Sequence, residues 1–468
     1  MSSLKNWTVS FTETFPDFPQ RTHRLDELGY PSDKATRTVA VLGFGRRKQV
    51  FVTSGSGAET EGSPQNFDPQ YPPNGRYFSL ASFPVDPASF KVFRGLNGTY
   101  ELPKAEYLLD ATNGYVVLSN PVRRGETIIT DSISFSDVNH PRFFLAEQAA
   151  ALYAIYGQPG GTNTISSGVE LAIANGAKQL VVVQGDHSGK DPYWFQAYAA
   201  LSTLDAYFVV PMHGSYYRNI VAAGLSSTQQ SSDVAHRRER ILLVGEVQRE
   251  NIDDPNYFDR SVVTDFNNEE RMLLLVGDEI TTVIQGESQI AEGGYLAAAC
   301  AGLWSSYEYV PEPLTRKSLA RLSQNWKNPD RYTQKQIDQF AKEGMTLILP
   351  KNGISIVYQG AMTLTDSNPV DAEPSIWRIR DYVALSIREV LQNRFAGQVI
   401  LKDTPKEVEK VTILALQGLV SQKIITKFAE VRVYVDPLEP RQMDIGFSVA
   451  PVFPLNGVSV AIRVLSSL

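Results

Sequence analysis

Residues 271–277 read RMLLLVG, and residues 240–245 read RILLVG. Both are unbroken runs of large aliphatic side chains that end in glycine, and residues 180–183 and 207–210 are two further apolar runs of this kind. A strand without polar alternation is typical of a parallel sheet that is covered on both faces. Because segments with helical spacing lie between these runs, the sequence predicts an α/β domain with a largely parallel sheet.

The helices expected between these strands are marked by apolar spacing and by the residues at their ends. Apolar residues fall at helical spacing in residues 144–155, and Gly157 follows them. Residues 166–174 and 195–204 are expected to form two more helices. Residues 293–303 read GGYLAAACAGL, which predicts a helix of small residues suited to close packing.

The stretches on either side of this α/β region have different patterns. Residues 38–44 and 48–53 are expected to be strands of a β-rich region, in which residues 107–118 predict a hairpin with an Asn-Gly turn. Residues 376–394 and 406–422 are expected to be amphipathic helices of a C-terminal region.

The length of 468 residues exceeds what one hydrophobic core usually serves, so several domains are expected. We predict an α+β multidomain protein with a small β-rich domain, an α/β domain, and a C-terminal α/β polymerisation domain with extended terminal arms. The predicted boundaries are residues 1–33 for an N-terminal arm, 34–137 for the β-rich domain, 138–330 for the α/β domain, and 331–468 for the C-terminal domain with its terminal arm strand.

Both ends of the chain carry short alternating patterns. Trp7, Val9 and Phe11 alternate with polar residues, which suits a short strand. A second alternation predicts an arm strand close to the C-terminus, and its apolar residues are Val458, Val460, Ile462 and Val464. Such a free strand can add to the sheet edge of a neighbouring copy through main-chain hydrogen bonds.

The overall composition excludes some classes of partner. The formal net charge is -7, and because phosphate neutralisation needs clustered Lys and Arg, no nucleic acid is expected as a partner. The apolar runs are far shorter than a membrane span, so no direct membrane insertion is expected. The N-terminus has no basic start followed by an apolar core, so no signal peptide is predicted and folding in a cytoplasm is expected.

No motif in the sequence predicts a catalytic residue, a cofactor or a metal site. Residues 185–190 (GDHSGK) follow a buried strand but lack the spacing of a phosphate-binding loop, so a surface turn is the better interpretation. The histidines show no metal-ligand spacing, although His187 and His213 follow strands, where catalytic groups often lie. Cys300 is interpreted as a small buried hydrophobe. A triad assembled in space stays open, because its members can be distant in sequence.

Four segments, in their order along the chain, resemble the contractile-tail sheath protein family. They are residues 195–211 (FQAYAALSTLDAYFVVP), 294–314 (GYLAAACAGLWSSYEYVPEPL), 332–363 (YTQKQIDQFAKEGMTLILPKNGISIVYQGAMT) and 376–397 (IWRIRDYVALSIREVLQNRFAG). Residues 107–135 and 152–183 are similar to the family more loosely. The order of these segments carries the resemblance more than any one of them does.

The resemblance implies a structural subunit, not an enzyme, that forms stacked hexameric rings around a tail tube. Its implied partners are identical sheath subunits, the tail tube protein, and the baseplate and tail terminator proteins, and no cofactor is implied. The implied location is the tail of a virion assembled in the host cytoplasm. Contraction of such a sheath drives the tube through the host envelope.

The resemblance also implies that the C-terminal domain faces the tube. Lys402, Lys406 and Lys410 follow i, i+4 spacing on the helix expected there, and they are candidates for contact with an acidic tube surface. A solvated helix face is an equally weighted interpretation of these lysines.

Two other functions stay open on the sequence. One is an α/β hydrolase-like enzyme, and the other is a different virion structural protein such as a baseplate or capsid component. Long striated tubes of the purified protein favour the sheath, whereas discrete small oligomers favour the enzyme. Neighbouring genes for a tail tube and a baseplate would separate a sheath from other virion components.

Overall fold

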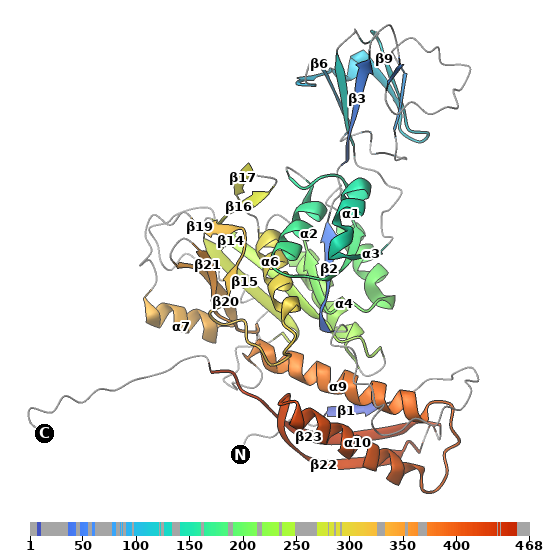
Figure 1. The fold of residues 1–468 in the computed structure, drawn as a ribbon, viewed down its shortest axis with the longest axis vertical. Coiled ribbons are helices and arrows are strands. Elements are labelled where there is room, and N and C mark those ends of the chain that lie inside the picture. Colours follow the sequence, from blue (N-terminus) through green and yellow to red (C-terminus); the bar gives the residue numbers. More distant parts are fainter. Residues whose placement is uncertain are drawn as a thin grey trace, which may run out of the picture.

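The computed structural model describes three bodies along the chain, which Figure 1 shows one above the other. The described residues are 7–10, 36–43, 47–54, 59–60, 77–80, 85, 87, 90–95, 98–120, 122, 126–132, 141–160, 163–185, 191–212, 218–233, 236–248, 269–278, 280–284, 287–290, 293–324, 333–351, 354–363, 372–437, 439 and 441–455. We call the three bodies the outer β unit, the α/β body and the C-terminal unit. Within these residues, no helix is both long and apolar enough to span a bilayer.

A nine-stranded sheet forms the centre of the α/β body. Its strands, in spatial order, are β11 (Arg142–Leu145), β12 (Gln179–Gln184), β2 (Thr38–Gly43), β13 (Phe208–Pro211), β14 (Ile241–Gln248), β15 (Met272–Asp278), β20 (Met345–Lys351), β21 (Ile354–Gln359) and β18 (Ser318–Leu319). The pairings from β12 to β20 are parallel, and those of β11, β21 and β18 are antiparallel. The predicted large, mostly parallel sheet is therefore confirmed.

Strands of this sheet are buried on both faces, as their unbroken apolar runs predict. In β2, Val39 and Val41 point into one hydrophobic core, whereas Ala40 and Leu42 point into the core on the opposite face. All four side chains are fully buried. Successive residues of a strand point to opposite faces, so only a strand covered from both sides buries every residue.

Helices cover both faces of the sheet. One core receives side chains from α1 (Ala149–Tyr156), α2 (Thr164–Ala174) and α6 (Gly293–Ser306). The other core receives them from α3 (Asp191–Ala200), α4 (Arg218–Ser231) and α7 (Gln334–Lys342). The α/β body is therefore a three-layer α/β/α arrangement.

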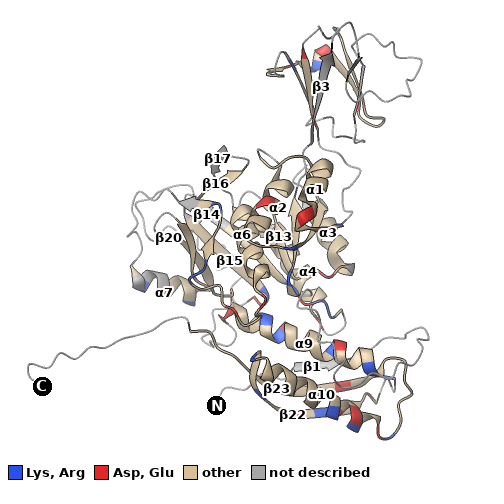
Figure 2. Cartoon of the chain, viewed as in Figure 1, with Lys and Arg blue, Asp and Glu red and all other residues tan. Residues whose placement is uncertain are grey.

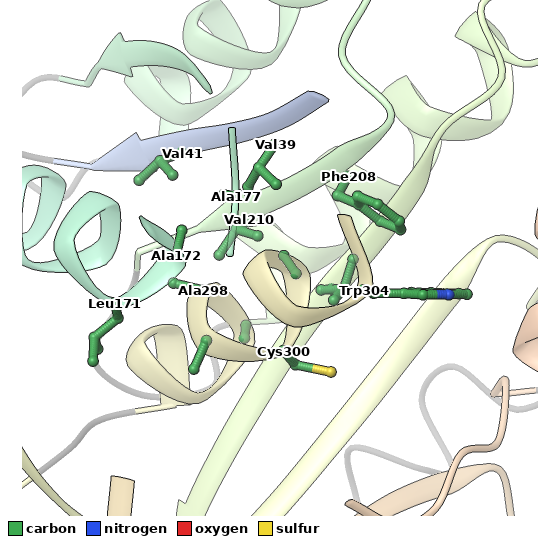
Figure 3. Close-up of a cluster of buried hydrophobic side chains, with 14 of the residues drawn as sticks. Val39, Val41, Leu171, Ala172, Ala177, Phe208, Val210, Ala298, Cys300 and Trp304 are labelled. Carbon is green, nitrogen blue, oxygen red and sulfur yellow. The ribbon is translucent and has the colours of Figure 1, made fainter. Parts of the chain in front are cut away.

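The small residues of α6 allow it to lie directly against α2. A Cβ atom added at Gly302 would collide with the backbone of Ala172, so glycine is required there for this close approach. Figure 3 shows Ala172, Ala298 and Cys300 together in this part of the core. The predicted close-packing helix is confirmed.

Two elements differ from the expectations. The strand expected at residues 38–44 in the β-rich domain is β2, which lies in the large sheet between β12 and β13. The helix expected from residue 144 starts later, because residues 142–145 form β11, which pairs antiparallel with β12. In both places the longer-range strand pairing decides the structure, and local spacing does not reveal it.

The outer β unit consists of two antiparallel sheets. The first has the order β4 (Glu59–Thr60), β3 (Arg47–Ser54), β10 (Thr127–Ser132), β6 (Lys91–Gly95) and β7 (Tyr100–Glu101), and the second has the order β5 (Tyr77–Ser79), β9 (Tyr115–Leu118) and β8 (Tyr107–Asp110). Phe78, Phe90, Val116 and Ile128 are buried in its own small core. The predicted hairpin is confirmed, because β8 pairs with β9 across a turn in which Gly114 has a φ of 74°.

Another small sheet lies beside the α/β body and has the order β17 (Glu287–Ile290), β16 (Ile280–Ile284) and β19 (Leu322–Gln324). The C-terminal unit combines α9 (Pro374–Phe395) and α10 (Thr404–Ser421) with a three-stranded sheet. That sheet has the order β1 (Trp7–Ser10), β23 (Met443–Pro451) and β22 (Ile425–Val435), so it joins strands from both ends of the chain.

Candidate assembly surface

The C-terminal unit has its own core between two helices and one sheet. Ile387 of α9, Leu416 of α10, and Ile445 and Phe447 of β23 all lie in this core. In β23, Ile445, Phe447 and Val449 are buried at every second position, which directs one face of the sheet towards the helices. The C-terminal unit is thus a two-layer body in which one sheet packs against a pair of helices.

The outer edge of this sheet is formed by β22. Within the described parts of the chain, β22 pairs with β23 on one side and with no strand on the other. Its residues are mostly exposed, and Tyr434 is exposed by 51%. An unpaired strand of eleven residues offers a row of backbone N–H and C=O groups to an added strand.

The three lysines singled out in the sequence lie at the start of α10. Lys402 lies in the turn before the helix, Lys406 and Lys410 lie on the helix, and all three are exposed. The Lys406 Nζ is 3.8 Å from the carboxylate of Asp403, but both side chains are more than three-quarters exposed, so this ion pair contributes little. Figure 2 shows basic and acidic residues interspersed over α9 and α10. Contact of the lysines with a tube stays a prediction.

An exposed apolar loop, which was not among the predicted contact residues, leads into α10. Val399 is exposed by 77% and Leu401 by 67%, in the connection between α9 and α10. The backbone N–H of Leu401 donates a hydrogen bond of 2.8 Å to the Thr404 hydroxyl, which ties the loop to the start of α10. The stretch QVIL (398–401) shows this loop in the sequence, since it is apolar although it lies between two expected helices. Connections between helices are usually polar, so an apolar connection indicates a contact surface.

A buried ion pair connects α9 to the α/β body. Two guanidinium nitrogens of Arg271 donate to the two carboxylate oxygens of Asp381, each over 2.9 Å. The Tyr207 hydroxyl donates to the same carboxylate over 2.8 Å. The side chains of Arg271 and Asp381 are exposed by only 7% and 1%. Tyr207 and Arg271 lie immediately before β13 and β15, so Asp381 links α9 to one end of the large sheet.

The electrostatics of this group are consistent with a charged pair beside a neutral phenol. Burial raises the pKa of Tyr207 well above its usual value, and the negative charge of Asp381 raises it further. Burial alone would lower the pKa of Arg271, but the charge and hydrogen bonds of Asp381 outweigh that effect and raise it. Arg271 therefore stays protonated and Tyr207 stays a hydrogen-bond donor at neutral pH.

Further contacts extend this connection along α9. The guanidinium of Arg388 donates to the carboxylate of Glu239 over 2.7 Å and 3.2 Å, and also to the carbonyl of Arg237 over 3.1 Å. Arg378, which is fully buried, donates to the carbonyl of Tyr307 over 2.9 Å. The sequence signal is the placement of Arg378, Asp381 and Arg388 at spacings of three and seven, which puts charged residues on one face of an amphipathic helix.

The residues weighed for catalysis do not form a site in the described structure. Cys300 is fully buried and its pKa is raised by burial, which confirms its interpretation as a small buried hydrophobe. His187 and His213 lie outside the described residues, as do residues 186–190 of the proposed surface turn. Among the residues described, no group of three or more His, Cys, Asp and Glu side chains is arranged to hold a metal ion.

The predicted terminal arm strand also lies outside the described residues, which end at Leu455. Its residues Val458, Val460, Ile462 and Val464 therefore stay a prediction. The last described residues follow directly from β23 and are exposed, with Phe453 at 55% and Leu455 at 80%. The chain thus leaves the C-terminal unit with apolar side chains facing solvent.

The three bodies together define a mixed α+β architecture with one large, mostly parallel sheet and several small antiparallel sheets. Its fold is that of the sheath proteins of contractile injection systems. The contracted helical sheath of the anti-feeding prophage aligns with 70% of this chain and 89% of that chain, with a TM-score of 0.53 and 13% identity. The contracted sheath complex of an extracellular contractile injection system, PVC, aligns with 70% and 87%, with a TM-score of 0.52 and 13% identity.

A chain in the sixfold-symmetrised baseplate of the anti-feeding prophage is also similar. It aligns with 70% of this chain and 88% of that chain, with a TM-score of 0.53 and 14% identity. No protein-family model matches the sequence, and no curated protein matches it. The resemblance found in the sequence is therefore confirmed at the level of the fold.

Proposed function

We propose that this protein is the subunit of a contractile sheath, which polymerises around an inner tube and contracts without a bound nucleotide. The observation that supports this most is the C-terminal unit, in which a sheet with an open edge lies on a helix pair fixed to a sheath-like body. Such a subunit contacts its neighbours through different patches, which produces open helical polymers instead of closed dimers. Contraction then needs only two packings that differ in free energy.

The proposed link between subunits is the C-terminal arm. The arm strand carrying Val458, Val460, Ile462 and Val464 would add to the β22 edge of a neighbouring copy, with main-chain hydrogen bonds giving affinity and the aliphatic side chains giving specificity. The exposed chain up to Leu455 supports this proposal, because the arm starts at the surface next to the sheet.

Deletion of residues 457–468 tests the arm. We expect a folded subunit that no longer forms tubes, as judged by circular dichroism and negative-stain electron microscopy. A matched variant changes the apolar positions Val458, Val460, Ile462 and Val464 to Ser, and its control changes only Ser459→Thr and Ala461→Ser. Tubes of normal appearance from the deletion variant would refute the arm.

The proposed tube contact is the exposed lysine stripe with its apolar neighbours. Lys402 directly follows the exposed apolar residues Val399 and Leu401 in the chain, and Lys406 and Lys410 are exposed on α10, which begins at Thr404. A surface with basic and apolar groups suits an acidic protein surface. A triple Lys→Glu variant should form polymers that no longer enclose a tube. The control reverses three exposed lysines elsewhere, Lys104, Lys178 and Lys342. If polymers of the triple Lys→Glu variant still enclose a tube, the lysines are better interpreted as a solvated helix face.

The finer assignments extend the same proposal. The polymer would consist of stacked hexameric rings that meet a baseplate protein at one end and a tail terminator protein at the other. It would belong to the tail of a virion assembled in the host cytoplasm, and its contraction would drive the tube through the host envelope. Imaging of the purified polymer tests this directly, since long striated tubes are expected and discrete small oligomers would contradict a sheath.

A further inference from the structure

We propose that neighbouring copies of this chain contact each other in the polymer through the two opposite edges of the large sheet. Phe143 at one edge of one copy inserts into an apolar groove at the other edge of the next copy. This inference rests on the proposed function and names one contact between its subunits. The partner is therefore a second copy of this chain.

The inserted side chain lies on β11, which is the strand at one end of the large sheet. Phe143 is exposed by 55%, whereas Phe144, the next residue in the strand, is exposed by 7% and packs against Tyr156. Within the described residues, β11 pairs with β12 on one side and with no strand on the other. Phe143 therefore forms an apolar projection at this edge of the sheet.

The groove lies at the other end of the sheet, where β18 is the last strand. It has a volume of about 730 Å³, and its apolar lining consists of Ile173, Val283, Leu303, Leu319, Leu322 and Ile354. Val283 and Ile354 are exposed by 43% and 51%. Exposed apolar side chains that gather in one hollow mark an interaction surface, unlike the same residues scattered singly.

The shape of the groove is fixed, because side-chain bonds tie the turn after β18 to α2. The Asn175 amide nitrogen donates to the carbonyls of Leu171 and Ala320 over 2.9 Å and 3.2 Å. The Asn175 amide oxygen accepts from the N–H of Ala320 over 2.7 Å. The guanidinium of Arg321 donates to the carboxylate of Glu170 on α2. A hollow that is formed in advance loses little free energy to rearrangement when it takes an apolar group.

The positions of the projection and the groove select a second copy as the partner. The nine strands of the sheet leave eight spacings of about 4.8 Å, or about 38 Å, between β11 and β18. Phe143 therefore cannot reach the groove of its own chain. Two different patches at opposite edges give a heterologous contact, which repeats from copy to copy and forms a ring or a helix.

The charges beside the two patches also match. Arg142, which precedes Phe143, is exposed. The helix α2 ends at Ala174, and residues 173–176 line the groove, so the negative end of the helix dipole lies there. A basic group beside the incoming side chain suits this end of the groove.

The first test measures the effect of the projection on assembly. Phe143→Ser should raise the subunit concentration at which tubes form by about tenfold, because it removes the burial of about half of a Phe side chain. The control is Phe195→Ser, since Phe195 is exposed by 45% but lies on α3 and on neither edge strand. The control should assemble like the wild type. Equal assembly thresholds of the two variants, both folded by circular dichroism, would overturn the contact.

The second test locates the contact by cross-linking. Arg142→Cys keeps the Phe143 side chain in place, Ser318→Cys puts a thiol in the lining of the groove, and Cys300→Ala removes the single native thiol. A short bismaleimide cannot join two positions about 38 Å apart in one chain, so every link joins two copies. Tubes of this variant should give a ladder of linked chains on denaturing gels, and the dilute subunit should stay single.

Two controls separate this contact from chance proximity. A variant with only one of the two cysteines cannot give linked products longer than two chains. Addition of Phe143→Ser to the double-cysteine variant should remove most of the ladder, in tubes assembled at a concentration high enough to offset the weaker contact.

The outcomes distinguish this contact from the proposed function. Tubes of the double-cysteine variant that give no products longer than two chains would overturn the contact and leave the sheath function standing. A ladder that Phe143→Ser does not change would overturn the insertion of this side chain. A wild-type chain that forms no tubes at all would instead overturn the proposed function, and the contact with it.

Discussion

The α/β body carries two other bodies, and the chain attaches them by different means. The C-terminal unit is joined through α9, whose buried charges Arg378, Asp381 and Arg388 all contact groups of the α/β body. The outer β unit is joined where β2 leads into β3 and where β10 leads back towards β11. Figure 1 shows it standing apart at the far end of the molecule. Its described ion pairs, such as Arg94 with Glu126, lie inside the unit itself.

Under the proposed sheath function, this difference predicts which parts of the subunit move together during contraction. A buried, bidentate ion pair contributes little net stability compared with apolar packing, but it fixes one geometry, because any displacement leaves a charge buried without its partner. The C-terminal unit should therefore rotate together with the α/β body. The outer β unit has a separate core and should follow that movement without being needed for it.

The largest effect is expected from Asp381→Ala. Removing this carboxylate leaves the buried guanidinium of Arg271 without its partner, which should lower the free energy of unfolding by about 3–5 kcal/mol. Chemical denaturation followed by circular dichroism measures this change. The control is Asp205→Ala, whose carboxylate is 3.5 Å from Arg238 but 85% exposed. If Asp381→Ala lowered the free energy of unfolding as little as Asp205→Ala does, α9 would not be a fixed connection between the two bodies.

A compensating variant sharpens the same comparison. Arg271→Met combined with Asp381→Leu removes both charges and keeps apolar volume, so it should recover most of the stability lost in Asp381→Ala. If sheath assembly also returns with the double variant, fixed geometry and not charge is what assembly requires. Recovery of stability without assembly would assign a further role to the charges.

A smaller effect is expected from Arg388→Ala. This guanidinium makes two hydrogen bonds to Glu239 and is exposed by 11%, so its loss should lower the free energy of unfolding by about 2 kcal/mol. Arg388→Lys keeps the charge but not the paired geometry, and it should fall between the wild type and Arg388→Ala. If the wild type, Arg388→Ala and Arg388→Lys were equally stable, Arg388 would not contribute to the connection between α9 and the α/β body.

The smallest effect is expected from excision of the outer β unit. Arg47 lies opposite Ser132 at the base of the β3–β10 pair, so the chain enters and leaves the unit at neighbouring points. Replacing residues 47–132 with a short Gly-Ser linker should change the stability of the remaining protein by less than about 0.5 kcal/mol. A collapse of the α/β body in thermal unfolding would show that the outer unit is part of its structure.

The sequence predicts those parts of the fold that depend on local pattern. Unbroken aliphatic runs identify strands buried on both faces, and the small residues of 293–303 identify the close contact of α6 with α2. The i, i+4 spacing of Lys402, Lys406 and Lys410 predicts one exposed side of the helix, and all three side chains are exposed. Their contact with an acidic tube surface stays a prediction.

Features that depend on distant partners could not be predicted from the sequence. The run at 38–44 is recognisable as a strand, but nothing local tells which sheet it enters. Asp381 and Arg271 are 110 residues apart, and only the folded chain brings them together. The apolar stretch at 398–401 is visible in the sequence, but only the structure shows that Val399 and Leu401 are exposed.

The position of β2 in the large sheet also affects the order in which the parts of the protein fold during synthesis. β2 is the first strand of the large sheet to leave the ribosome, yet its neighbour Gln179 lies 141 residues further along from Thr38. At the speed of translation, β2 waits on the order of ten seconds for that neighbour. During this time the outer β unit can complete its own core, so we expect it to fold first and the central sheet to close around β2 afterwards.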